Sequence, residues 1–129
     1  MNTLAHLLVD MLSTAPGLVP LYREHLVVHD ELLPHVFMAD ITRWVAEARA
    51  PGSEYGETAR DLVAVIDTHL GSGDAEVREV IVVSFLENLE RGVVAHEGVR
   101  AWFGPELRAA AARLDATRAN GSTRRNLLS

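Results

Sequence analysis

Two histidines spaced four residues apart are the first candidates for chemistry in this sequence. On a helix, His25 and His29 would share one face, with Asp30, Glu31 and His35 nearby. Two imidazoles at this spacing can bind a metal ion. However, residues 26–28 contain no acid of the metalloprotease kind, and the chain has no Glu-x-x-His pair of the di-iron kind. We therefore predict no metal and no cofactor, and keep as an alternative a small metal-binding enzyme that uses His25, His29 and His35.

A second candidate is Ser84, which could act as a nucleophile with His69 and Asp67 as helpers. Nucleophilic serines are usually held at sharp turns or helix starts, where the hydroxyl is exposed beside an oxyanion hole. The middle of an apolar helix offers neither. We expect Ser84 to donate a hydrogen bond to the carbonyl four residues earlier, or to pack as a small residue where helices cross.

Two further patterns have simpler interpretations than catalysis. Residues 71–73, Gly-Ser-Gly, precede a helix and could cradle a phosphate, but they follow a predicted helix, lack a Lys and have acidic neighbours. We interpret them as the stop of one helix and the start of another. Glu87 and Glu90 could form a catalytic carboxylate pair, although a solvated acidic face, or an acidic face that meets a basic partner, is the simpler explanation. The prediction is a protein that is not an enzyme.

The element that must position these residues is a central helix at residues 74–91. This stretch contains no Gly or Pro and is flanked by Gly73 and Gly92. At helical spacing its apolar residues cover more than one side, which predicts neighbours on several sides. The β-branched run 80–85 would also suit a buried strand. Length, the capping residue Asp74 and the terminal charges favour the helix.

Apolar residues recur at helical spacing in the rest of the chain as well. We predict helices at residues 4–14, 18–31, 34–50 and 55–70, a helical turn or two near residues 99–103, and a last helix that starts at Pro105. Short breaks make successive helices antiparallel neighbours. The predicted fold class is an all-α, single-domain bundle of about five to six helices, with antiparallel hairpins around the central helix. Residues 1–117 form this domain, and residues 118–129 are predicted to be a flexible tail.

Composition restricts the class of protein further. The 129 residues include no Cys and no Lys, so all twelve basic residues are Arg. The length predicts one domain with a core that needs no disulfide. The N-terminus has no basic start and carries Asp10 in its apolar segment, which argues against a signal peptide. No apolar run reaches the length of a membrane span. We therefore expect a cytoplasmic protein with no membrane contact.

The charge is distributed unevenly. Residues 1–117 carry nine Arg against eighteen Asp and Glu, a net charge of −9. Residues 54–90 alone carry nine acids against two Arg, a net charge of −7. Such a surface repels nucleic acid and attracts a basic protein. The predicted partner-binding residues are Glu54, Glu57, Asp61, Glu76, Glu79, Glu87 and Glu90.

One alternative is a helical adaptor or scaffold protein for an endogenous partner. In this version a homodimer would form through exposed apolar residues such as Trp102 and Phe103.

Three segments resemble an uncharacterised group of small bacterial helical proteins. They are ELLPHVFMADITRWV at residues 31–45, EVIVVSFLENLE at residues 79–90 and FGPELRAAAARLD at residues 103–115. This group is associated with the immunity proteins of polymorphic and contact-dependent toxin systems. The resemblance implies a single-domain antidote that binds a cognate toxin and blocks its active site, with an acidic surface facing a basic, nuclease-like toxin domain. It contains no catalytic motif, so it assigns no role to an individual residue.

Overall fold

Proline and glycine divide the chain into its helices. The computed structural model describes residues 3–91 and 96–128, and the side chains of residues 3–89 and 98–117. Its elements are α1 (Leu4–Thr14), a 3-10 turn η1 (Pro16–Leu18), α2 (Val19–His29), α3 (Pro34–Ala48), α4 (Gly56–Ser72), α5 (Ala75–Val80), a π-helical segment η2 (Ile81–Leu86), α6 (Glu87–Arg91), α7 (His96–Arg100) and α8 (Pro105–Leu128). No strand occurs in the described residues. The predicted all-α fold is confirmed.

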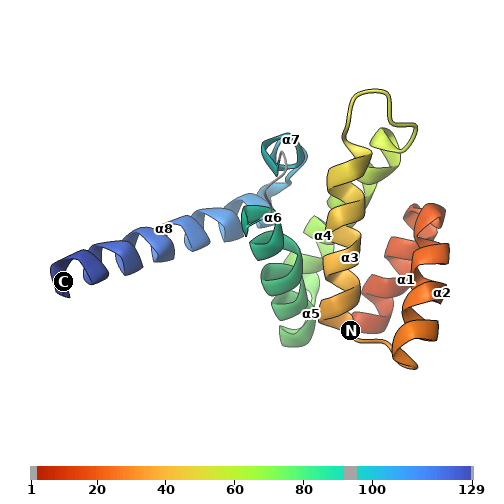
Figure 1. Ribbon diagram of the computed structural model, residues 1–129, viewed down its shortest axis with the longest axis horizontal. Coiled ribbons are helices and arrows are strands. Elements are labelled where there is room, and N and C mark those ends of the chain that lie inside the picture. The colour runs from red at the N-terminus through yellow and green to blue at the C-terminus, as the bar shows by residue number, and fades with distance from the viewer. Residues whose placement is uncertain (1–2, 92–95, 129) are drawn as a thin grey trace.

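The helices pack as successive hairpins (Figure 1). The chain turns by 111° between α1 and the η1–α2 segment, and α2 lies at one side of the bundle. α4 then runs antiparallel both to α3 and to the α5–η2–α6 stretch, which are themselves parallel (Figure 1). α1 packs on α4, and η2 packs on α3. The α5–η2–α6 stretch, which the sequence predicts as the central helix, thus packs on α3 through η2 and lies on the side of α3 and α4 away from α2 (Figure 1).

The core is built from the apolar faces that the helical spacing predicts. Ile41 and Val45 of α3 are fully buried, as are Leu62 and Ile66 of α4. Phe85 is the largest fully buried side chain and comes from η2. Tyr55 differs from the prediction, because it precedes the first residue of α4 and is 45% exposed.

The central stretch is helical throughout but is not a uniform α-helix. Asp74 caps it as predicted, since its Oδ1 accepts a hydrogen bond from the Val77 amide at 3.0 Å. Further along, the Glu87 amide donates to the carbonyl of Val82 five residues earlier. The π-helical segment between them was not predicted. A π-helical turn changes which backbone carbonyls are used within the helix and which can accept hydrogen bonds from other groups.

α8 is attached to the bundle by a cap from another helix. The Leu107 amide lies in the first turn of α8 and donates to Oδ1 of Asp67, a buried residue of α4, at 2.8 Å. Gly104 leaves the space that this carboxylate needs, because a Cβ there would overlap it. The first turns of α8 therefore pack on α4, and the helix then extends away from the bundle (Figure 1).

The backbone of α8 is helical to Leu128 and so includes residues 118–128 of the segment predicted to be a flexible tail. The segment contains no Pro, and a helix satisfies its backbone hydrogen bonds without tertiary contacts. Lack of apolar periodicity was therefore a poor criterion for the end of this helix.

Candidate functional site

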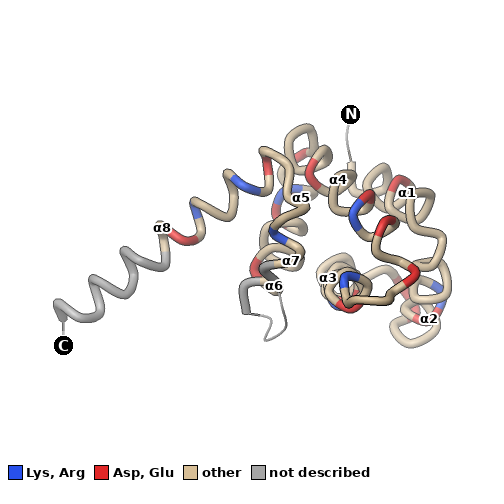
Figure 2. Tube along the Cα trace, turned by 90° about the horizontal axis from the view of Figure 1, so that it is seen from above, with Lys and Arg blue, Asp and Glu red and all other residues tan. Residues whose placement is uncertain are grey.

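The seven predicted partner-binding acids do not form a single surface. Glu54 lies in the turn before α4, Glu57 and Asp61 lie on the first turns of α4, Glu76 and Glu79 lie on α5, Glu87 begins α6, and the side chain of Glu90 is outside the described residues. α4 and α5 are antiparallel, so their first turns lie at opposite ends of α4 (Figure 1). The 17 residues of α4 correspond to about 25 Å. Figure 2 likewise shows acidic positions spread over the whole bundle.

The acids of α5 have a structural explanation. Glu76 lies in the first turn of α5, directly after the capping residue Asp74, and Glu79 follows one turn later. Carboxylates at a helix N-terminus interact favourably with the helix dipole, typically by about 0.3–1 kcal/mol. These positions therefore need no partner to account for their charge.

Two acids of α4, Glu57 and Asp61, lie on one exposed face of that helix. Glu57, Asp61, Ala64, Val65 and Thr68 occupy positions i, i+4, i+7, i+8 and i+11, and we call these five residues the α4 face. Like charges at i and i+4 destabilise a helix by about 0.2–0.5 kcal/mol. Within the described side chains, neither carboxylate of this face forms an ion pair.

At its lower end, the α4 face runs into a pocket of about 220 Å³ between α1 and α4. The pocket is lined by Asp10 of α1 and by Ala64, Val65, Thr68 and His69 of α4. Oδ2 of Asp10 lies 2.6 Å from Nε2 of His69. The His69 side chain is only 5% exposed, whereas that of Asp10 is 56% exposed. The buried imidazole thus holds a carboxylate that remains accessible.

Neither member of this pair was predicted as a site residue. Asp10 entered the sequence reading only as an argument against a signal peptide, and His69 only as a helper for Ser84. A signal existed, since Asp10 borders the apolar stripe of α1 formed by Leu7 and Met11. That signal did not identify the partner, which lies 59 residues away.

Two aromatic residues lie at the other end of the α4 face. The rings of Trp44 and Tyr55 are 5.8 Å apart and tilted by 49°. Trp44 is half-buried against the core, and Tyr55 is exposed. A hydrogen bond with Glu54, followed by the charge of that carboxylate, raises the pKa of Tyr55. An exposed tyrosine backed by a tryptophan is typical of the anchor residues at protein interfaces.

The three histidines of the metal alternative do not converge. The rings of His25 and His29 are 4.6 Å apart, but Nε2 of His25 accepts a hydrogen bond from the Leu33 amide at 3.0 Å. Nδ1 of His35 lies instead 2.6 Å from the hydroxyl of Ser84. Among the described residues, no group of three His, Cys, Asp or Glu side chains could hold a metal ion. A metal site built from all three histidines is therefore wrong.

Ser84 pairs with a histidine, although not with the predicted one. Its hydroxyl contacts His35 and does not bond to a carbonyl of its own helix, while His69 pairs with Asp10 and Asp67 caps α8. A Ser–His pair can activate a nucleophile only where the hydroxyl is accessible. Ser84 is 4% exposed, so the pair acts as a tie between α3 and η2.

The carbonyl of Ser84 strengthens the same connection. It accepts a hydrogen bond from the Asn88 side-chain amide at 2.7 Å, and at 3.1 Å it shares the single hydroxyl hydrogen of Thr42 with the Met38 carbonyl, which lies 2.8 Å from the same hydroxyl. The π-helical turn therefore has side-chain partners for a carbonyl at the crossing of α3 and η2. Its role here is structural.

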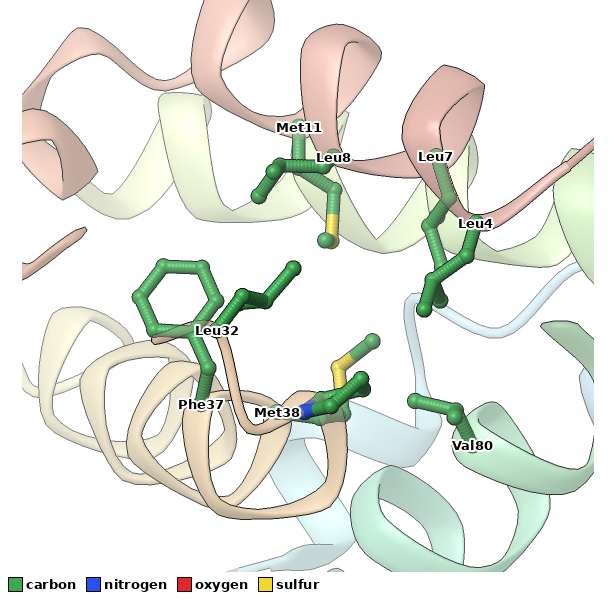
Figure 3. A pocket seen from close by; sticks show the side chains of 9 residues that line it. Leu4, Leu7, Leu8, Met11, Leu32, Phe37, Met38 and Val80 are labelled. Atoms are coloured by element: carbon green, nitrogen blue, oxygen red, sulfur yellow. The ribbon is translucent and has the colours of Figure 1, made fainter. Parts of the chain in front are cut away.

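A smaller cavity lies between α1, α3 and α5 (Figure 3). Its volume is about 20 Å³, and the lining residues are Leu4, Leu7, Leu8, Met11, Leu32, Pro34, Phe37, Met38 and Val80. Space of this size is enough for about one water molecule, which would find almost no polar partner there. The cavity is a packing void and offers no ligand site.

The dimer surface of the adaptor alternative is also altered by the structure. Phe103 is 3% exposed, and Trp102 is half-buried against the core. The expectation that both are exposed was wrong, because the loop after α7 folds back onto the bundle. The most exposed large apolar side chains in the described residues are instead Val27 and Val28 of α2.

The described helices can be compared with the length and hydropathy that a membrane span requires. None of them alone is both long and apolar enough to cross a bilayer; α1 and the η1–α2 segment meet that measure only as a bent pair.

These features define a small all-α helical-bundle domain with a pocket at the junction of α1 and α4. The chain belongs to the family described as "Domain of unknown function (DUF7674)", whose model matches residues 9–118. No curated protein and no solved structure matched the chain. The matched range includes the α4 face, Asp10 and the docked part of α8.

Proposed function

We propose that this domain is a non-enzymatic binding protein of the toxin-immunity kind, which neutralises a basic bacterial toxin by binding it. The observation that carries the proposal is the α4 face, where Glu57 and Asp61 are exposed and unpaired within the described side chains. Their mutual repulsion lowers helix stability slightly, and binding of a basic surface would relieve it.

The surroundings of the α4 face support the same function. Glu54 and the exposed Tyr55 lie directly before the first residue of α4, and Asp10 borders the pocket nearer its last turns. An exposed aromatic anchor combined with several carboxylates suits a partner with a basic surface. The resemblance to immunity proteins names the kind of partner, a cognate toxin domain made by the same bacterium or by a competitor.

The test is a charge reversal with a matched control. The test variant carries Glu57→Arg and Asp61→Arg, and the control variant carries Glu76→Arg and Glu79→Arg. Both pairs change the charge by the same amount and begin in the first turn of a helix. Any loss of helix stability therefore affects the two variants similarly.

Binding is measured with the partner captured from a lysate of the source organism at low and moderate salt. We expect one basic polypeptide in a simple ratio with the wild-type chain and the control. Reversal on α4 should lower the association rate by about tenfold or more and flatten its salt dependence. Equal binding by both variants, or capture of no basic polypeptide, would refute the proposal.

A further inference from the structure

The pocket between α1 and α4 has the size and chemistry to hold a basic side chain. We propose that it receives an arginine of the partner, whose guanidinium pairs with the carboxylate of Asp10. This inference rests on the proposed function, since it identifies the chemical group that the partner inserts. The α4 face leads directly into this pocket, because Ala64, Val65 and Thr68 belong to both.

The carboxylate of Asp10 is held in place and still accessible. Nε2 of His69 lies 2.6 Å from one oxygen of Asp10, Oδ2, and only 5% of the His69 side chain is exposed. Within the described residues, Oδ1 of Asp10 has no hydrogen-bond partner. A fixed carboxylate with one free oxygen loses little freedom when it binds a cation.

Among the described residues, the imidazole of His69 has one polar side-chain contact, which is with Asp10. Its Nε2 faces Asp10, and its Nδ1 is buried without a hydrogen-bond partner among the described residues. A buried polar atom without a partner carries an energetic cost, which the contact of Nε2 with the Asp10 carboxylate helps to offset.

The walls of the pocket match the rest of an arginine side chain. Ala64 and Val65 offer apolar surface to its methylene groups. The Thr68 hydroxyl donates to the Ala64 carbonyl at 3.1 Å, so its lone pairs remain for an N–H donor. A volume of about 220 Å³ corresponds to about seven water molecules, which a single long side chain can displace.

The charge around the pocket selects a cation. Asp61 lies one turn before Ala64 on the same face, and residues 1–117 carry a net charge of −9. A bound metal ion would need more ligands than one carboxylate and one imidazole, and no group of three such side chains occurs in the described residues. Guanidinium suits the site better than ammonium, because its five N–H donors are fixed in one plane, so that one can pair with the free Oδ1 of Asp10 while others remain for the Thr68 hydroxyl.

The experiment is an NMR titration of the full chain with N-acetyl-arginine methylamide. The control ligand is the citrulline analogue, which has nearly the same shape and no charge. We expect saturable shifts of the amide signals of Asp10, Thr68 and His69 with the arginine compound. The citrulline compound should bind about tenfold more weakly, or less.

Three variants locate the binding. Asp10→Asn keeps an acceptor for His69 and removes the charge, and should lower the affinity about tenfold. Ala64→Leu narrows the pocket without touching the carboxylate, and should have a similar effect. Glu24→Gln removes an exposed acid of α2 outside the pocket, and should leave the affinity unchanged. Shifts that are equal with citrulline, or unaffected by the first two variants, would overturn the inference.

The same variants separate this inference from the proposed function. If the captured partner binds the wild-type chain, Asp10→Asn and Ala64→Leu equally well, the pocket is not used and the inference fails while the proposed function stands. If no basic partner is captured but the titration behaves as expected, the proposed function fails and the arginine site remains.

Discussion

The cap that attaches α8 to the bundle gives the sharpest stability prediction. Asp67 is 8% exposed, and its carboxylate accepts the amide hydrogen of Leu107, a fully buried residue. Asp67→Ala leaves that amide without a partner in an apolar environment. Loss of a charge-assisted hydrogen bond at a helix N-terminus costs about 1–3 kcal/mol, so we expect about 2 kcal/mol.

For a chain of 129 residues this loss corresponds to a decrease of about 7 °C in the melting temperature. The assay is urea and thermal unfolding followed by far-UV circular dichroism. Asp67→Asn keeps an acceptor oxygen and loses the charge, so its cost should be about half as large. The control Asp61→Ala removes an exposed acid of the same helix and should change the unfolding free energy by less than about 0.5 kcal/mol.

Gly104 provides an independent check of the same contact. A Cβ at this position would overlap the carboxylate of Asp67, so Gly104→Ala should also destabilise the fold, by about 1–3 kcal/mol. In the Asp67→Ala background the overlap is gone, and the cost of Gly104→Ala should fall by more than half. Additive losses in this double-mutant cycle, or an Asp67→Ala variant as stable as the control, would refute the packing of α8 described above.

Two more predictions concern the α2–α3 side of the bundle. Burial, followed by the charge of His29, lowers the pKa of His25 below 6.5, and its Nε2 accepts from the Leu33 amide only when unprotonated. The stabilisation from neutral His25 is complete above pH 6.5 and is lost as the pH falls below that value. Between pH 7.5 and about 5.5, wild type should therefore lose more unfolding free energy than His25→Gln does. Parallel pH profiles of the two proteins would contradict this prediction. Thr42→Val removes a donor to the Ser84 carbonyl and should cost about 1 kcal/mol in urea unfolding, whereas an unchanged midpoint would show that this bond adds nothing.

Helix locations could be predicted because the sequence states them locally. Pro34 begins α3 at a position where its missing amide hydrogen is harmless, and Asp74 caps the central stretch with its own side chain. Apolar spacing identified the buried faces for the same reason. Tyr55 was placed wrongly because it fits the spacing of α4 but lies before the helix begins.

The π-helical segment could not be predicted in this way. Its carbonyl partner on another helix, Thr42, precedes Ser84 by 42 residues, and no local pattern in residues 81–86 announces the extra residue in the turn. In a uniform α-helix, Ser84 and Asn88 would face α3 in different directions from those that the π-helical segment gives them. The tie between Ser84 and His35 is therefore a product of tertiary packing.

The candidate site depends even more on how helices cross. Counting charge along the sequence placed Glu57 and Glu76 on one surface, although antiparallel helices bring successive N-termini to opposite ends of the bundle. The crossing of α1 and α4 places Asp10 against His69 and opens a pocket beside the acids of α4. The net negative charge of the chain thus follows from its composition. The position at which a basic group can bind depends on the crossing of α1 and α4. Asp10→Asn changes the net charge no more than Glu24→Gln does, so a difference between these two variants would measure that geometry directly.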